Sequence, residues 1–356
     1  MERRELSVKQ YMKLLSVGLM PALVRRVPGH QAAWAGRGAW LAPLGALIPL
    51  LLIVWLIARA GQHLGEGDGL GEFYCLCFGE KLGRVVCGLC GLWLVVVGCF
   101  GLRFCAERFI SSIYPDTGLG LFFLVLLAVV WWLSRQKLSV TARVGQVFFY
   151  GIVAMLALIV ILVLGQVRLD RLWPVWTADL PLVLRAGGEV VNTMSLGTGA
   201  LFLFSRTGFR RSGGALAARW VSGWCAALTV LGAVVLGTFG YQLAGRMQIP
   251  FFSLAKEVRP ERLESVVAAT WVLADIILLS IILRSAVIAF EISLGRELPG
   301  AGGVLALMLL PGAYLTAGSS FALEAAYDGW EAVGKNIVFL GLPLAALVTG
   351  KLRRVL

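Results

Sequence analysis

The chain has 356 residues, of which 59% are hydrophobic and 15% are charged, and its formal net charge is +12. Soluble domains contain about 45–50% apolar residues, so this composition excludes an ordinary soluble protein and indicates an integral membrane protein. The apolar runs are continuous rather than alternating, which excludes a transmembrane β-barrel. We ascribe the positive charge to loops that face anionic lipid, and not to nucleic-acid binding.

Taken in chain order, the apolar runs predict ten membrane-spanning helices and no soluble domain. Lysine and arginine are more frequent in the segments that face inward when both termini are cytoplasmic, so we expect that orientation. The whole chain, residues 1–356, is expected to form a single transmembrane domain in contact with the lipid bilayer. The ten predicted spans are approximately residues 11–27, 38–60, 84–112, 118–134, 142–166, 188–208, 219–243, 264–291, 302–318 and 334–350.

The first predicted span is short and contains residues that interrupt helices. Its roughly 17 residues would reach about 25 Å, whereas the hydrocarbon core of a bilayer is about 30 Å thick. Gly18 and Pro21 lie near its middle. Because a proline removes a backbone hydrogen bond inside a helix but suits the first turn of a new one, we expect a break there.

The sixth predicted span carries Gly197, Thr198 and Gly199 at its centre. Interrupted spans at corresponding positions of two halves are typical of inverted-repeat transporters. We therefore predict an all-α, LeuT-like, five-plus-five membrane fold with repeats at about 1–166 and 188–350, in which helices 1 and 6 are discontinuous. The alternative is that the glycines serve close helix packing, because Ser195 and Gly199 form a small-xxx-small pair.

In such a fold the two breaks meet near the middle of the membrane. Freed N–H groups there can face an anionic group, and freed carbonyl groups can face a cation or an amine. An amino acid carries both kinds of group. The predicted ligand-binding residues, including one buried acid discussed next, are Gly18, Pro21, Asn192, Ser195, Gly197, Thr198, Gly199 and Asp275.

Two predicted spans carry ionisable residues, which are costly at membrane depth and usually face the protein interior. In the third span Arg103 and Glu107 lie four residues apart on one face, so we expect a structural ion pair rather than a proton relay. In the eighth span Arg284 and Glu291 share a face and receive the same structural or relay assignment. Asp275 lies deep on the opposite face from Arg284, and we expect its partner on helix 1, 3 or 6.

The cysteines raise the question of a metal site. The spacing of Cys75, Cys77, Cys87 and Cys90 resembles a four-thiolate zinc site. However, Cys87 and Cys90 open an apolar helix, where cysteine behaves as a small hydrophobe, so we expect no metal and no other cofactor. The sequence also contains no convincing nucleophile–base arrangement and no phosphate-binding loop, so we do not expect an enzyme.

Six local motifs, in this order along residues 6 to about 295, resemble those of the B subunit of bacterial spore germinant receptors, in the amino acid–polyamine–organocation transporter superfamily. The family features are a Ser-x-x-Gln before helix 1, a Gly-Arg-Asp-Ala-Trp lead into helix 2, a Gly-Lys-x-x-Gly lead into helix 3, an Arg-x-x-x-Glu in helix 3, and the approaches to helices 6 and 8. The matching motifs are LSVKQYMKLL (6–15), AGRGAWLAPL (35–44), FGEKLGRVVCGL (78–89), LRFCAERFISSIYPDT (102–117), RLWPVWTADLPLVLRAG (171–187) and IPFFSLAKEVRPERLESVVAATWVL (249–273).

The resemblance implies a multi-pass subunit of a germinant receptor in the spore inner membrane, with an A subunit and a lipoprotein C subunit as partners. Its transporter-type pocket would sense a small nutrient, usually an amino acid, and help to trigger germination. Arg25 and Arg26 depart from the family, which typically has a neutral pocket wall there. Two alternatives stay open: a secondary transporter of an amino acid or polyamine, and a scaffold subunit without a ligand.

Overall fold

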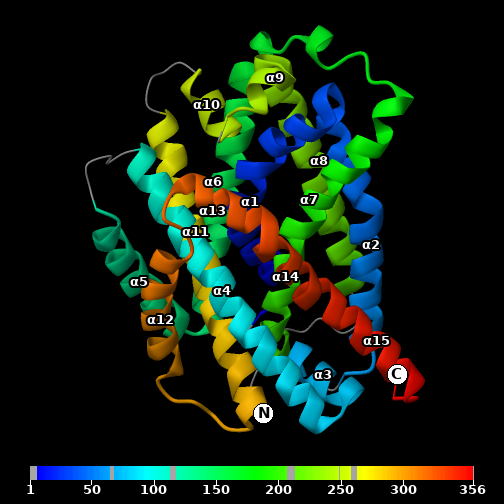
Figure 1. The fold of residues 1–356 in the computed structure, drawn as a ribbon, viewed down its shortest axis with the longest axis vertical. Coiled ribbons are helices and arrows are strands. Elements are labelled where there is room, and N and C mark those ends of the chain that lie inside the picture. Colours follow the sequence, from blue (N-terminus) through cyan, green and yellow to red (C-terminus); the bar gives the residue numbers. More distant parts are fainter. Residues whose placement is uncertain are drawn as a thin grey trace.

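A computed structural model describes residues 6–64, 68–112, 118–206, 213–247, 249–257 and 263–355. These residues form a bundle of helices (Figure 1). The helices are α1 (Val8–Ala35), η1 (Gly36–Leu41), α2 (Ala42–Ala60), α3 (Leu70–Phe78), α4 (Glu80–Ser112), α5 (Leu119–Arg135), α6 (Leu138–Val163), η2 (Leu164–Gln166), η3 (Leu169–Arg171), η4 (Thr177–Asp179), α7 (Leu180–Gly199), η5 (Ala200–Arg206), α8 (Gly213–Phe239), α9 (Tyr241–Ala244), α10 (Pro250–Lys256), α11 (Leu263–Leu294), α12 (Ala301–Leu315), α13 (Ser320–Ala326), η6 (Tyr327–Glu331), α14 (Ala332–Asn336), η7 (Ile337–Gly341) and α15 (Leu342–Leu352).

Several of these helices have the length and composition of membrane spans. Within the described residues, six helices or helix runs are long and apolar enough to cross a membrane, and α5 and α12 are shorter apolar helices. The count of ten spans is therefore not confirmed. Large apolar side chains such as Ile48, Leu121 and Val147 are exposed on the bundle, as contact with lipid requires. The six runs are Val8–Arg59, Glu80–Arg108, Leu138–Gln166, Gly213–Phe239, Ser265–Leu294 and Ser320–Leu352.

Four helices form the centre of the bundle. Helix α11 packs along α4, and α1 packs against both α7 and α11. Helices α2 and α8 cover α7 and α1 on one side, and α5 and α12 cover α11 and α4 on the other (Figure 1). Any site between α1, α4, α7 and α11 is therefore enclosed by further helices.

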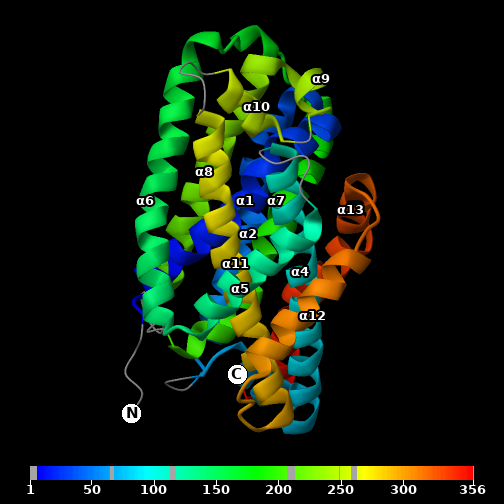
Figure 2. The same ribbon diagram turned by 90° about the vertical axis from the view of Figure 1, so that its left-hand side faces the viewer.

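The two ends of the described chain lie at the same end of the bundle. Figures 1 and 2 show the start of α1 and the end of α15 at one end, and α9 and α10 at the opposite end. This arrangement is compatible with the predicted orientation, in which both termini lie on one side of the membrane. That this side is the cytoplasmic one stays a prediction.

The predicted break in helix 1 is wrong. Helix α1 runs without interruption for 28 residues, with Pro21 and Pro28 inside it, and so reaches about 42 Å. Pro21 leaves the carbonyl of Val17 without its usual donor, but a full break would free several more backbone groups. Because lipid offers those groups no hydrogen bonds, the continuous helix is the less costly solution.

The predicted discontinuity of helix 6 is confirmed. Helix α7 ends at Gly199, and the chain continues from Ala200 as the 3₁₀ helix η5. A change to 3₁₀ geometry alters the helical pitch and the directions in which the following side chains point. The change falls at the end of the Gly197-Thr198-Gly199 stretch that the sequence singled out.

The last helical run is also interrupted, which the sequence analysis did not predict. The π-helical segments η6 and η7 separate α13, α14 and α15, and Gly329 leaves the helical region with φ −86° and ψ −107°. Such π segments are frequent at functional sites. The run begins at Ser320, well before residue 334, where the predicted tenth span starts.

Candidate functional site

A small enclosed cavity lies where α1, α4, α7 and α11 meet. Its volume is about 10 Å³, which is room for about one water molecule. Gly18 of α1 and Gly197 of α7 both line it, so the structure brings these two predicted site residues together. The lining residues are Leu15, Gly18, Leu19, Leu94, Leu196, Gly197, Ala200, Leu278, Ile281, Ile282 and Ser285.

The cavity wall is aliphatic except for one hydroxyl group. Ser285 of α11 is fully buried, and its Oγ has no hydrogen-bond partner among the described residues. A buried hydroxyl without a partner costs free energy that a bound polar group would recover. Ser285 is not among the predicted site residues, because one serine in an apolar span carries no distinctive pattern.

The glycines of α7 have different surroundings. A methyl group added at Gly197 would have Leu19 Cδ1 as its nearest neighbour at 3.7 Å, which is ordinary contact. At Gly199 an added methyl would lie 2.9 Å from Phe339 Cε1 and 3.0 Å from Leu94 Cδ2. Gly197 therefore borders the cavity, whereas Gly199 allows close packing, as the alternative interpretation of these glycines held.

The other residues predicted on α1 and α7 do not line the central cavity. Thr198 lines a second apolar cavity of about 40 Å³ beside α2, α3 and α15. The hydroxyl of Ser195 donates to the Asn192 carbonyl at 2.7 Å, while the side-chain oxygen Oδ1 of Asn192 is buried without a partner among the described residues. Pro21 is buried within α1, nearly one turn beyond Gly18. Of this set, Asn192 alone has a buried polar atom still free to bind.

The expected partner of Asp275 is found on the third predicted span. Arg108 Nη1 of α4 lies 2.7 Å from Asp275 Oδ2, and both residues are buried. The guanidinium also lies 5.2 Å from the centre of the Trp271 ring. Asp275 is therefore engaged in an ion pair between α4 and α11, about one turn before Leu278 at the cavity.

The remaining charged residues predicted in the spans hold structural contacts. The predicted ion pair of Arg103 and Glu107 is present, with Arg103 Nε 2.7 Å from Glu107 Oε1. Arg284 donates to the carbonyl of Gln136 at 2.6 Å, and Glu291 accepts a bond from the N–H of Leu298 at 3.1 Å. Glu291 thus holds the segment that follows α11, and Arg284 ties α11 to the end of α5.

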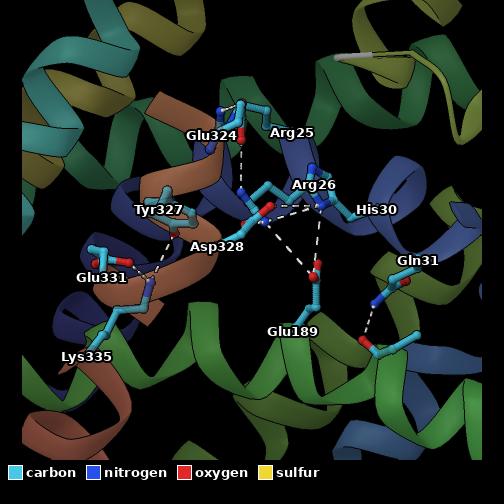
Figure 3. A network of polar contacts seen from close by, with 11 residues as sticks. Arg25, Arg26, His30, Gln31, Glu189, Glu324, Tyr327, Asp328, Glu331 and Lys335 are labelled. Carbon is cyan, nitrogen blue, oxygen red and sulfur yellow. Dashed lines mark hydrogen bonds and ion pairs between the residues drawn. The ribbon is translucent and has the colours of Figure 1, made fainter. Parts of the chain in front are cut away.

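A cluster of charged residues, in which the arginines are buried and Glu324 and Asp328 are partly exposed, joins α1 to α13 and η6 (Figure 3). Arg25 Nη1 lies 2.6 Å from Glu324 Oε1, and Arg26 Nη1 lies 3.1 Å from Glu324 Oε2. Arg26 also pairs with Asp328, and more weakly with Glu189 of α7 at 4.0 Å. Both arginines are buried, because α1 continues to Ala35, beyond residue 27 where the predicted first span ends.

Tyr327 stands at the centre of this charge cluster (Figure 3). Its ring centre lies 4.6 Å from Arg26 Cζ and 4.3 Å from Lys335 Nζ, within the range of cation–π attraction. Lys335 donates to the Tyr327 hydroxyl at 3.1 Å and to Glu331 Oε2 at 3.0 Å. Lys335 and Glu331 are almost fully buried, which places a complete ion pair inside the protein.

The acidic and basic residues of this cluster beyond residue 320 follow a helical spacing in the sequence. Glu324, Asp328, Glu331 and Lys335 follow one another at intervals of four, three and four residues. That spacing places all four on one face of a helix. A polar face of this kind beside an apolar span indicates buried partners on another helix.

Three groups in the cluster lie close enough together to hold a metal ion. The ligand atoms of His30, Glu324 and Asp328 lie within 4.8 Å of one another. However, Arg26 already pairs with both carboxylates, and its Nη2 lies 3.3 Å from His30 Nδ1. A cation would have to displace this fixed positive charge, so we assign no metal here.

Comparison with known proteins assigns the chain to a family. The family model described as "Spore germination protein" matches residues 5–295. The chain belongs to the spore germination protein family. Spore germination protein KB of Bacillus subtilis (strain 168) is 24% identical to this family member over 272 residues, covering 73% of the chain and 70% of that protein.

The fold of this spore germination protein is that of a transporter. Mhp1, a nucleobase-cation-symport-1 family transporter solved in a closed conformation with bromovinylhydantoin bound, aligns with a TM-score of 0.64. The identity is 13%, and the alignment covers 95% of this chain and 79% of Mhp1. This likeness confirms the predicted all-α, LeuT-like transporter fold, while the repeat boundaries stay a prediction.

The family match and the charge cluster overlap only in part. Arg25, Arg26 and Glu189 lie within the matched residues 5–295, whereas Glu324 and Asp328 lie beyond them. The central cavity, from Leu15 to Ser285, lies entirely within the match. The cavity is thus built from the part of the chain that defines the family.

Proposed function

We propose that this chain is the nutrient-sensing membrane subunit of a spore germinant receptor, and that its ligand binds between α1, α4, α7 and α11. The observation that carries the proposal is that Gly18 and Gly197 line one cavity at the crossing of these four helices. Membership of the spore germination protein family and the transporter fold support the same function. The proposed ligand is a small nutrient, in the first place an amino acid.

The proposed setting follows from the family. The chain is a multi-pass membrane protein, and we propose that it lies in the spore inner membrane with both termini in the cytoplasm. Its proposed partners are the A subunit and the lipoprotein C subunit of the receptor. The proposed function is that of a receptor, in which binding shifts the chain between conformations and helps to trigger germination.

Ligand binding in this cavity requires movement. A cavity of about 10 Å³ holds about one water molecule, which is less than an amino acid needs. Helices α1 and α7 must therefore separate near Gly18 and Gly197 when the ligand enters. A ligand shifts this balance only by its higher affinity for the open conformation.

Thermal stabilisation of the purified chain by a panel of amino acids, nucleosides and sugars tests this proposal, because a ligand that binds the folded state raises its stability. We expect at least one amino acid to raise the unfolding temperature. Gly197→Val, which fills the cavity, should abolish the rise. Gly223→Val on α8 is the control, because nothing lies within 4 Å of a methyl group added there. Lack of stabilisation by any compound, or an unchanged response of Gly197→Val, contradicts the proposal.

The transporter fold supports a second candidate function, namely secondary transport of an amino acid or polyamine. Uptake of labelled substrate by proteoliposomes that contain this chain alone separates the two. Gradient-driven flux favours transport, whereas binding without flux, together with a need for partner subunits in germination, favours the receptor. A chain that binds no ligand but is required for assembly of the receptor is the third candidate, a scaffold.

A further inference from the structure

Ser285 differs from six other serine and threonine residues in the helices of this protein. Serine and threonine in helices commonly donate to the carbonyl four residues earlier, which satisfies the hydroxyl within its own helix. Ser285 lies inside α11 and is 0% exposed, yet its Oγ has no hydrogen-bond partner among the residues that the structure describes. The residues that make such bonds are Ser16, Thr229, Thr238, Thr270, Ser280 and Thr349.

The position of Ser285 explains what its hydroxyl can bind. It lines the central cavity opposite Gly18 and Gly197, and every other lining residue is leucine, isoleucine, alanine or glycine. A buried water usually makes about three hydrogen bonds, whereas this cavity offers it a single polar side chain. A water molecule in this cavity would therefore lack partners for most of its hydrogen bonds. The Ser285 hydroxyl remains available to a polar group that enters with a ligand.

We propose that the Ser285 hydroxyl is a specificity-determining contact for the ligand, and that the ligand is a small aliphatic amino acid. This inference rests on the proposed function. A serine hydroxyl can accept a hydrogen bond from an ammonium group or donate one to a carboxylate, and an amino acid carries both. The aliphatic wall formed by Leu19, Leu278 and Ile281 favours a small apolar side chain and disfavours a charged one.

Replacement of the hydroxyl has two opposite expected effects. Ser285→Ala removes a buried polar group that has no partner, so the unfolding temperature of the ligand-free protein should rise or stay the same. The same change removes a hydrogen bond to a charged group of the ligand, which corresponds to about 10- to 100-fold weaker binding. A residue with a purely structural role would not strengthen the free protein while weakening the complex.

Ser280 provides the matched control on the same helix. It is 1% exposed, and its hydroxyl already donates to the carbonyl of Ile276 at 2.7 Å. Ser280→Ala should therefore leave the affinity for the ligand unchanged and should not raise the unfolding temperature. Ser285→Cys keeps the size of the side chain but has a weak hydrogen-bonding group, so its affinity should lie between those of wild type and Ser285→Ala.

The experiment measures unfolding temperatures of the full chain with L-alanine, L-valine, L-leucine, L-aspartate and L-lysine at increasing concentrations. We expect stabilisation by the aliphatic amino acids, at 10- to 100-fold higher concentrations for Ser285→Ala than for wild type. Equal affinity of Ser285→Ala and wild type overturns this inference but leaves the proposed function standing. A response to aspartate or lysine instead of the aliphatic amino acids overturns the ligand class. If the wild type responds to no compound of the wider panel, the proposed function fails, and this inference fails with it.

Discussion

Glu324→Gln tests whether the charge cluster around Arg25 and Arg26 stabilises the protein. Glu324 lies 2.6 Å from Arg25 and 3.1 Å from Arg26, and the two arginines are 6% and 4% exposed. Glutamine keeps the shape of the side chain but removes its charge. Arg26 retains Asp328, whereas Arg25 has no second carboxylate within 4 Å among the described residues. Breaking a buried ion pair costs about 3–5 kcal/mol, and because Glu324 is 21% exposed we expect about 3 kcal/mol.

An exposed ion pair in the same chain provides the control. Arg84 and Glu80 also lie 2.6 Å apart, but their side chains are 43% and 74% exposed. Exposed pairs of this kind contribute about 0.5 kcal/mol or less, so Glu80→Gln should change stability very little. The shortest nitrogen–oxygen distance is the same in both pairs, so the comparison contrasts a buried contact with an exposed one, and the double-mutant cycle below separates the share of Arg25 from that of Arg26.

The assay is denaturant unfolding of the purified chain in mixed micelles, completed as a double-mutant cycle with Arg25→Met. We expect the cycle to give a coupling free energy of about 2 kcal/mol or more between Arg25 and Glu324. A cost for Glu324→Gln no larger than that for Glu80→Gln, or a cycle without coupling, refutes the argument. In that case the arginines would obtain their stabilisation from other groups, such as the rings of Phe104 and Tyr327.

Three further predictions concern other parts of the fold. Asp275→Asn weakens the buried ion pair with α4 and should lower the free energy of unfolding by roughly 3 kcal/mol, and an unchanged value in the same assay would show that the pair is not stabilising. Gly199→Ala places a methyl group 2.9 Å from the Phe339 ring and should lower the free energy of unfolding by about 1–3 kcal/mol. The control Gly223→Ala should be neutral or slightly stabilising, and equal effects of the two variants would exclude tight packing at Gly199. Burial raises the pKa of the Cys77 thiol to about 11 and leaves the residue 0% exposed, so iodoacetamide at pH 8 should alkylate it in the unfolded protein but hardly in the folded one, and equal labelling of both states by peptide mass spectrometry would disprove this.

The transporter fold and the two glycines that line the central cavity could be predicted from the sequence. Apolar runs must become helices in lipid, since every backbone group has to be paired within the chain. The glycines at 197 and 199 were recognisable because two such residues around Thr198 weaken a helix that lipid would otherwise enforce. Gly197 and Gly18 do meet at one cavity, as the comparison of the two spans predicted. The sequence did not show that Gly197 borders the cavity whereas Gly199 lies in a packing contact. The packing contact of Gly199 depends on Phe339, which lies far along the chain.

The charge cluster could not be predicted by local reasoning. Arg25 and Glu324 are separated by 299 residues, so no pattern near Arg25 indicates how its charge is compensated. The cost of a charge at membrane depth shows only that a partner must exist. The same argument correctly required a partner for Asp275 on another helix, and Arg108 fills that role. For Arg25 and Arg26 no partner was expected, because they stand at the end of the predicted first span, residues 11–27, whereas α1 continues to Ala35 and places them inside the bundle.

The continuity of α1 has a functional consequence, because it links the cavity to the charge cluster. Gly18 lies at the cavity, and Arg25 follows it by seven residues, which is two turns on the same face of one helix. A helix broken at Pro21 would let the two parts move independently, whereas the continuous helix transmits a displacement at Gly18 to Arg25. A ligand that displaces α1 at Gly18 would therefore also strain the contact with Glu324.

Weakening that contact should consequently favour the ligand. If the Arg25–Glu324 pair stabilises the closed conformation more than the open one, Glu324→Gln raises the population of the open form and with it the apparent affinity. We expect the amino acid that stabilises the wild type to act on Glu324→Gln at a lower concentration, by up to about tenfold for each 1.4 kcal/mol of the pair that opening loses. Ligand titrations of the unfolding temperature measure this shift, and Glu80→Gln should show none. An unchanged or weaker affinity of Glu324→Gln would mean that the cavity opens without moving the charge cluster, so that α7, and not α1, moves on binding.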